Sequence, residues 1–157
     1  MKTGFPTSFS EPTQPQLPDA VPPWLRAITQ RARDGGIRRQ LSDLSRRRPQ
    51  LDDATRPSAV LMLLAGDPAY EPTPGTPYPE DARLLLTHRA PTLRSHSGQM
   101  AFPGGRKDPE DATPIDTAVR EAQEETAVRP DTMSPLAVLH PILIPRTGNV
   151  VSPVLAY

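Results

Sequence analysis

A glycine pair followed by a capped helix is the feature that most constrains the fold of this chain. Thr113 has the residue type of a helix N-cap, Pro114 suits the first helical position, and Asp116 lies three residues beyond the cap. This combination predicts a helix over residues 114–126. At helical spacing its apolar side chains share one face, as packing against a sheet requires. These side chains are Ile115, Ala118, Val119 and Ala122.

Three carboxylates crowd the end of this predicted helix. Glu121 and Glu125 lie one turn apart, and Glu124 lies further towards solvent. Like charges this close repel, and Arg120 is the one positive charge among them. Most glutamate-rich turns are solvated surface, so the turn on its own favours that interpretation. A divalent cation is the alternative, because hard ions such as Mg²⁺ take oxygen ligands from carboxylates and substrate phosphates.

The loop before the helix favours the metal interpretation. Phe102-Pro103-Gly104-Gly105 contains paired glycines, which permit positive φ and close approach of the backbone to a ligand. Together with the spaced Arg-Glu-Ala-Gln-Glu-Glu run at 120–125, this loop resembles the Nudix box of the Nudix hydrolases. Residues 85–105 are also similar to an extra signature of the coenzyme A pyrophosphatase branch. That signature places two arginines and a glycine ahead of the loop, here Arg89, Arg94 and Gly98.

The resemblance covers about residues 56–157 and implies a role for each charged residue of the box. Glu121 and Glu125 are implied to bind Mg²⁺ or Mn²⁺, with Glu124 as a further ligand or as the base that activates water. Arg120 is implied to orient the glutamates. The resemblance therefore makes Arg120, Glu124 and Glu125 the candidate catalytic residues, with Glu121 as a metal ligand.

The resemblance also implies a small-molecule substrate, coenzyme A or acyl-coenzyme A, cleaved to 3′,5′-ADP and 4′-phosphopantetheine or its acyl form. The backbone at Gly104 and Gly105 is implied to lie beside metal and substrate. Arg89 and Arg94 are candidates for binding phosphates by charge and forked geometry, and surface or fold-stabilising arginines are the alternative. Two other functions stay open: hydrolysis of another nucleoside diphosphate derivative, and a catalytically silent interaction module.

Several further positions leave alternatives open. Asp111 stands where the general Nudix pattern has glutamate, and a capping or surface role competes with metal contact. Ala127 replaces a glycine at a position suited to a left-handed helix end, which costs alanine roughly 1 kcal/mol, so we expect the helix to end differently. His96 is a candidate hydrogen-bond donor to a substrate phosphate, although an exposed side chain is the favoured interpretation. His88 and His140 are weaker candidates for the same role.

The chain contains 22 prolines, and their clusters help to divide it into three segments. Residues 1–21 hold few large apolar side chains, and we expect a disordered, proline-rich leader. Residues 22–55 repeat apolar side chains at helical spacing around Gly35-Gly36, which predicts two short helices packed on the core. The catalytic domain is predicted over residues 56–157, with strands near 59–64, 84–87, 136–144 and 150–156. The spaced apolar side chains of the second segment are Trp24, Leu25, Ile28, Ile37, Leu41 and Leu44.

This order of elements predicts an α/β fold, and the resemblance implies the Nudix α/β/α sandwich with a mixed sheet. Family members usually continue past the segment equivalent to residues 150–157 with more strand and a closing helix. We therefore expect a C-terminally truncated domain with one uncovered sheet face, which would expose apolar area and edge backbone. An interlocked oligomer is the alternative, and the oligomeric state stays open.

Composition excludes several classes of protein. Basic and acidic residues number 18 each, so no global field favours nucleic acid or a membrane surface as partner. The absence of cysteine excludes a disulfide framework, a thiolate metal site and a cysteine nucleophile, and agrees with a reducing cytoplasm. No run approaches the ~18 apolar residues of a membrane span. We expect a cytoplasmic protein.

Overall fold

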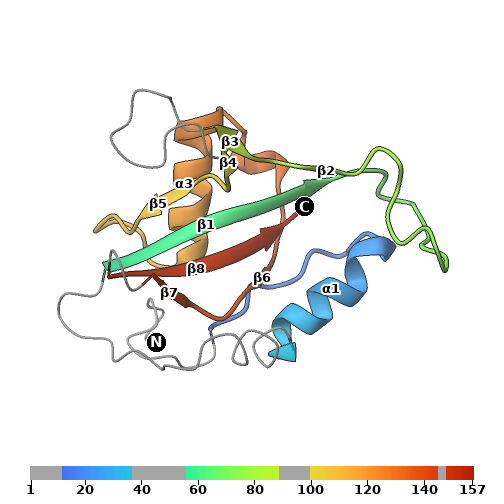
Figure 1. Cartoon of the computed structure of the whole chain (residues 1–157), viewed down its shortest axis with the longest axis horizontal. Coiled ribbons are helices and arrows are strands. Elements are labelled where there is room, and N and C mark those ends of the chain that lie inside the picture. Colours follow the sequence, from blue (N-terminus) through green and yellow to red (C-terminus); the bar gives the residue numbers. More distant parts are fainter. Residues whose placement is uncertain (1–11, 37–55, 89–99, 145–147) are drawn as a thin grey trace.

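A mixed β-sheet forms the centre of the computed structural model, which describes residues 12–36, 56–88, 100–144 and 148–157 (Figure 1). The strands are β1 (Arg56–Ala65), β2 (Arg83–Leu84), β3 (Thr87–His88), β4 (Met100–Ala101), β5 (Gly104–Arg106), β6 (Pro135–Val138), β7 (Ile142–Ile144) and β8 (Asn149–Ala156). The helices are α1 (Pro23–Arg33), α3 (Pro114–Thr126) and the 3₁₀ helix η1 (Pro130–Thr132). No helix among these described ranges is long and apolar enough to cross a membrane.

The two long strands β1 and β8 pair in parallel, from Arg56 opposite Asn149 to Leu63 opposite Ala156. The sheet order is β2-β1-β8-β6, and β5 also pairs with β1 while β7 pairs with β8. All of these outer pairings are antiparallel, so the predicted mixed sheet is confirmed. The strand predicted at 136–144 is split into β6 and β7, because Pro141 between them has no N–H to donate to a ladder.

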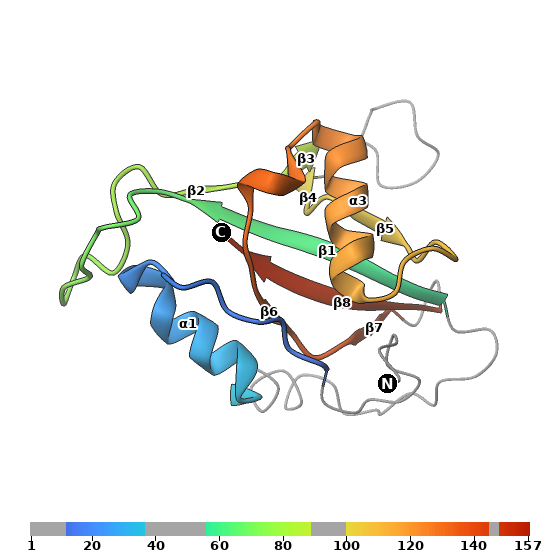
Figure 2. The same cartoon turned by 180° about the vertical axis from the view of Figure 1, so that it is seen from behind.

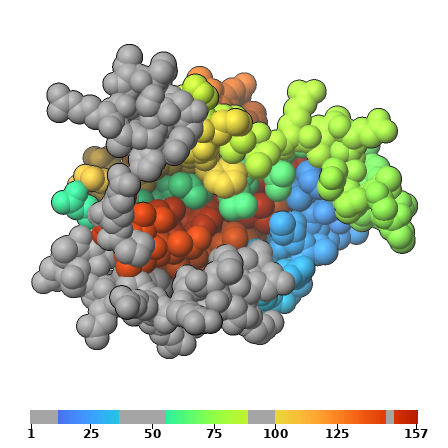
Figure 3. All heavy atoms as spheres, in the orientation of Figure 1, coloured from blue at the N-terminus to red at the C-terminus, as the bar shows by residue number. Residues whose placement is uncertain are grey.

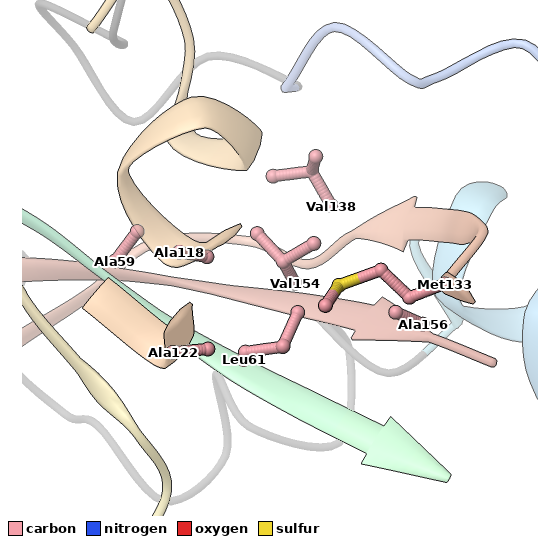
Figure 4. Close-up of a cluster of buried hydrophobic side chains, with 8 residues drawn as sticks. All are labelled: Ala59, Leu61, Ala118, Ala122, Met133, Val138, Val154 and Ala156. Carbon is pink, nitrogen blue, oxygen red and sulfur yellow. The ribbon is translucent and has the colours of Figure 1, made fainter. Parts of the chain in front are cut away.

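Helix α3 packs on one face of the sheet. Figure 4 shows Ala118 and Ala122 of the helix against Leu61 of β1 and Val154 of β8. All four side chains are fully buried, and the small alanines let the helix backbone approach the sheet closely. The predicted helix face is confirmed, with Ile115 and Val119 partly buried at its margin. This packing places the end of α3 beside β5, where the glycine pair lies.

Helix α1 covers part of the opposite face. Met62 and Leu64 of β1 alternate with Leu61 along the strand and pack against a second cluster that holds Trp24 and Leu25 of α1. The second face expected to be uncovered is therefore covered at its β6 end by the N-terminal helix. Within α1 one expectation was wrong: Ile28 is 40% exposed, and its neighbour Thr29 is buried instead.

The segment before α1 is also placed against the sheet. Figure 2 shows residues 12–22 running beside β6, and both amide atoms of Gln14 bond to the backbone of Val138. The expected disordered leader therefore does not include this stretch, because ordering it satisfies backbone groups of a distant strand. In Figure 3 the blue atoms of α1 lie against the green loop after β1, where Trp24 Nε1 donates to the Asp67 carbonyl at 3.0 Å. The second helix predicted before residue 56 lies outside the described residues.

Candidate functional site

The site is built on α3, whose predicted start and length are confirmed. Thr113 Oγ1 accepts from the Asp116 N–H at 3.3 Å, and Asp116 accepts from the Thr113 N–H at 2.7 Å, which forms a capping box. At the other end Ala127 adopts the left-handed conformation with φ 56°, and its N–H donates to the Gln123 carbonyl. The expectation that alanine would force a different helix end was therefore wrong. Ala127 itself is exposed, and the next residue, Val128, packs against the buried cluster under α3.

Two of the three glutamates reach the glycine pair of β5. The Gly104 N–H donates to Oε2 of Glu125 at 3.2 Å. A side-chain carbon on Gly105 would overlap the carboxylate of Glu121, so this position has room for the carboxylate only because it is glycine. Gly104 is equally constrained on its other side, where an added carbon would lie 2.7 Å from the Cα of Val60 on β1. Glu121 and Glu125 thus converge on adjacent backbone positions.

Arg120 joins the remaining charged groups. Its Nη1 donates to Glu121 at 3.0 Å and to Glu124 at 3.3 Å, while Nη2 and Nε donate to Asp111 at 2.9 and 3.3 Å. Nη2 also donates to the Arg106 carbonyl at 2.9 Å. All the nitrogens of the guanidinium are engaged, which fixes its plane and hence the two glutamates. One positive charge serves three carboxylates, so this group carries an excess of negative charge.

Asp111 is the buried anchor of Arg120. Its side chain is 6% exposed and also accepts from the Thr117 hydroxyl at 2.8 Å and the Asp108 N–H at 2.9 Å. These donors, Arg120 first, hold the pKa of Asp111 down at about 2, and Asp111 in turn raises the pKa of Arg120 above its ordinary value. Of the roles left open for Asp111, the structure supports neither the cap of α3, which is Thr113, nor an exposed surface position. Thr117 is fully buried and was missed, because a polar residue gives no hydrophobic signal.

The protein side chains could supply only part of the ligand set of a divalent cation. Within the described residues, no three acidic or histidine side chains are placed to hold a metal by themselves. The side chain of Glu124 is 59% exposed and bonds to Arg120, whereas Glu121 is 18% exposed beside Gly105. Mg²⁺ is usually bound by one or two carboxylates plus water and substrate phosphates, and Glu121 with Glu125 meets that requirement. The donor set therefore fits Mg²⁺ or Mn²⁺ completed by other ligands.

Several candidates fall elsewhere. Arg89, Arg94 and His96 lie outside the described residues. His88 is exposed on β3, and His140 lies between β6 and β7. The hydrogen bonds of Arg120 and Asp111 are made with residues other than these two histidines. The described part of the site therefore consists of the glycine pair and the network centred on α3.

Comparison with known proteins decides the family. Residues 75–149 match the family model described as the NUDIX domain. A relative from Klebsiella aerogenes, named Uncharacterized Nudix hydrolase NudL, is 51% identical over 99 residues, which are 63% of this chain and 72% of the relative. The chain belongs to the Nudix family. Nudix hydrolases generally use divalent metal ions, in agreement with the acidic character of the site.

Other Nudix relatives are longer than the matched region. A NudL relative from Cronobacter sakazakii is 43% identical over 119 residues, which are 74% of this chain and 55% of the relative. One from Klebsiella pneumoniae is 53% identical over 99 residues, 63% of this chain and 45% of the relative. The chain thus spans about half the length of these two relatives.

Solved Nudix structures were matched as well. A Nudix hydrolase from M. smegmatis, RenU, matches with a TM-score of 0.46 at 28% identity, over 64% of this chain and 59% of its own. A MutT/nudix family protein from Enterococcus faecalis matches with a TM-score of 0.46 at 19% identity, over 83% of this chain and 48% of its own.

Proposed function

We propose that this Nudix protein hydrolyses the pyrophosphate bond of coenzyme A or acyl-coenzyme A in a metal-dependent reaction. The observation that carries the proposal is the convergence of Glu121 and Glu125 on the glycine pair. Glu125 accepts from the Gly104 N–H, and the Glu121 carboxylate fills the space beside Gly105. Carboxylate oxygens beside the backbone of a half-buried glycine pair are suited to a hard cation and a phosphate.

The residues of this chain divide the work of the reaction. Glu121 and Glu125 would hold Mg²⁺ or Mn²⁺, which when bound lowers the pKa of water and neutralises charge that develops on the phosphate. Arg120 orients Glu121 and Glu124 through Nη1, and Asp111 fixes Arg120. Glu124 is the most exposed of the three glutamates, and its free oxygen is available to accept a proton from the attacking water.

The coenzyme A substrate rests on residues 85–105, which resemble the signature of the coenzyme A pyrophosphatase branch. Arg89 and Arg94 are the proposed phosphate-binding residues within it, because a guanidinium matches phosphate oxygens in charge and forked geometry. The same metal site supports hydrolysis of other nucleoside diphosphate derivatives, so the substrate is tested separately from the chemistry.

The substrate test follows products from a panel of pyrophosphates with Mg²⁺ present. We expect 3′,5′-ADP and 4′-phosphopantetheine from coenzyme A, at a higher kcat/KM than the products of a nucleotide sugar. Turnover of the nucleotide sugar without turnover of coenzyme A would replace the substrate and keep the metal chemistry. If neither coenzyme A nor the nucleotide sugar is hydrolysed by the folded protein, the alternative of a catalytically silent interaction module would be favoured.

The site test compares Glu125, which lies beside the glycine pair, with a glutamate outside the site. Glu125→Gln removes the charge beside Gly104, and we expect weaker Mn²⁺ binding by calorimetry and a loss of activity of about 100-fold or more. Glu71→Gln is the matched control, because Glu71 is exposed in the loop after β1 and outside the network. Equal metal affinity in the two variants would contradict the assignment of Glu125.

A further inference from the structure

The hydroxyl of Thr117 has an uncommon partner for a threonine inside a helix. A helical threonine often donates its hydroxyl to a backbone carbonyl three or four residues earlier. Thr126 of α3 does so, since its Oγ1 donates to the Ala122 carbonyl at 2.6 Å. Thr117 is fully buried, and its Oγ1 donates instead to Oδ2 of Asp111 at 2.8 Å, outside the helix. This buried hydroxyl therefore joins α3 to the loop before it.

The bond from Thr117 fixes the Asp111 carboxylate relative to α3. Oδ2 of Asp111 accepts from the Thr117 hydroxyl at 2.8 Å, the Asp108 N–H at 2.9 Å and Arg120 Nη2 at 2.9 Å. Asp108 holds the carboxylate from its own loop. Arg120 has a long side chain, so its bonds alone would let the carboxylate and the guanidinium move together. Thr117 is short and β-branched, with few rotamers, and it therefore ties the carboxylate to the helix.

The orientation of Asp111 bears on the glutamates through Arg120. Thr117 and Arg120 lie on neighbouring turns of α3 and donate to the same oxygen of Asp111. Nε of Arg120 adds a bond to Oδ1 at 3.3 Å, so a carboxylate held in one plane also holds the guanidinium in that plane. Nη1 of the guanidinium then reaches Glu121 at 3.0 Å and Glu124 at 3.3 Å.

We propose that Thr117 is a positioning residue of the metal site, whose hydroxyl holds Asp111 so that Arg120 keeps the glutamates in place. The effect on metal binding rests on the proposed function, whereas the effect on the Arg120 side chain does not. Residues that orient metal ligands typically change metal affinity or activity by about 10-fold to 100-fold when they are replaced. Thr117 acts through two further residues, so we expect the lower end of this range.

Two substitutions separate this role from the filling of space. Thr117→Val keeps the branched shape and removes the hydroxyl, whereas Thr117→Ser keeps the hydroxyl and removes a methyl group. A positioning role requires Thr117→Val to be impaired and Thr117→Ser to resemble the wild type, and a packing role requires the reverse. Thr29→Val is the matched control. Thr29 is a buried helical threonine of α1, and its hydroxyl has no hydrogen-bond partner within the described part of the chain.

The first measurement follows the Arg120 guanidinium by NMR in the metal-free protein. Hydrogen bonds to its nitrogens slow rotation about the Cζ–Nε bond, because rotation must break them. We expect the rotation rate to rise roughly 3-fold to 10-fold in Thr117→Val, as for the loss of one hydrogen bond, and to stay close to the wild type in Thr117→Ser and Thr29→Val. An unchanged rate in folded Thr117→Val would overturn the proposal, whatever the protein hydrolyses.

The second measurement follows the glutamates by Mn²⁺ calorimetry and steady-state kinetics. We expect Thr117→Val to bind Mn²⁺ about 10-fold more weakly and to lower kcat at saturating Mn²⁺, with KM nearly unchanged. Thr117→Ser and Thr29→Val should match the wild type. If the wild type and Thr117→Val bind Mn²⁺ equally tightly, the proposal is wrong. A wild type that binds no Mn²⁺ would instead contradict the proposed function, and the rotation rates would still decide whether Thr117 positions Arg120.

Thermal unfolding shows whether Thr117→Val folds. If it does not, Thr117→Ala takes its place, because alanine and serine are both smaller than threonine and differ from each other only by the hydroxyl. The positioning role then requires Thr117→Ser to bind Mn²⁺ more tightly than Thr117→Ala. Equal affinities in these two variants would refute it.

Discussion

Arg120 and Asp111 form a two-point contact, in which Nε donates to Oδ1 at 3.3 Å and Nη2 donates to Oδ2 at 2.9 Å. The contact links a loop residue to the helix that carries the glutamates. Because Nη1 of the same guanidinium bonds to Glu121 and Glu124, the position of Asp111 is transmitted to both carboxylates. The pair is therefore a structural element and a positioning device for the proposed metal site.

Asp111→Asn should weaken both stability and catalysis. The variant leaves Arg120 without its buried anionic partner, and we expect the free energy of unfolding to fall by about 2 kcal/mol, since Arg120 keeps partial solvent exposure. Displaced glutamates should lower kcat/KM for the pyrophosphate substrate by about 10-fold to 100-fold. Urea unfolding and steady-state kinetics measure the two effects.

Asp131→Asn provides the control for that variant. Arg129 and Asp131 form an ion pair of the same chemistry, but their side chains are 73% and 64% exposed. Exposed pairs contribute about 0–1 kcal/mol, so this variant should stay close to the wild type in stability and activity. Similar losses in the two variants would show that burial of Asp111 is not the cause.

Acid unfolding should reveal the lowered pKa of Asp111. Its pKa is about 2 in the folded chain against an ordinary 3.8, chiefly because Arg120 bonds to the ionised form. A lowered pKa stabilises the fold fully above the ordinary value, and the contribution disappears as the pH falls through 3.8 towards 2. We expect this carboxyl to account for about 2 kcal/mol of the fall in the free energy of unfolding. In urea titrations at several pH values, the free energy of unfolding of Asp111→Asn should fall less steeply over this interval than that of the wild type. Parallel curves for the two proteins would contradict the lowered pKa of Asp111.

Ala127→Gly should stabilise the chain. Ala127 has φ 56°, a conformation that costs an L-residue about 1 kcal/mol more than glycine. Differential scanning calorimetry should therefore give a higher Tm for the variant. Ala27→Gly is the opposite control, because Ala27 lies exposed inside α1 and glycine destabilises a helix interior by about 1 kcal/mol. A lower Tm for Ala127→Gly would refute the role of backbone strain.

Alanine at the two glycines of β5 should separate folding from function. In Gly105→Ala the new methyl overlaps the end of the flexible Glu121 side chain, so we expect activity to fall about 100-fold with a stability change within about 1 kcal/mol. In Gly104→Ala the methyl meets the backbone of Ala59 and Val60 on β1, so we expect a loss of about 3 kcal/mol. Thermal unfolding and steady-state kinetics of both variants check this contrast.

Local patterns predicted what local chemistry controls. Thr113, Pro114 and Asp116 set the start of α3 through bonds within a few residues, and the continuous apolar run over residues 59–64 lies within β1. The splits of the predicted strands 84–87 into β2 and β3 and 136–144 into β6 and β7 were less readable, because strand limits depend on partners elsewhere in the chain. Thr117 escaped prediction for the same reason: its burial depends on Asp111, which approaches from the preceding loop.

The sequence by itself determined the glycine pair, the capped helix and the glutamates on it, because capping and helical spacing act within one or two turns. Tertiary structure alone decided that Asp111 is buried under Arg120 and that α1 covers the second sheet face. It also brought Gln14 to Val138, 124 residues away in the chain. Contacts at such a separation depend on how the sheet is assembled, and no spacing of residues along the chain encodes where two distant backbones meet.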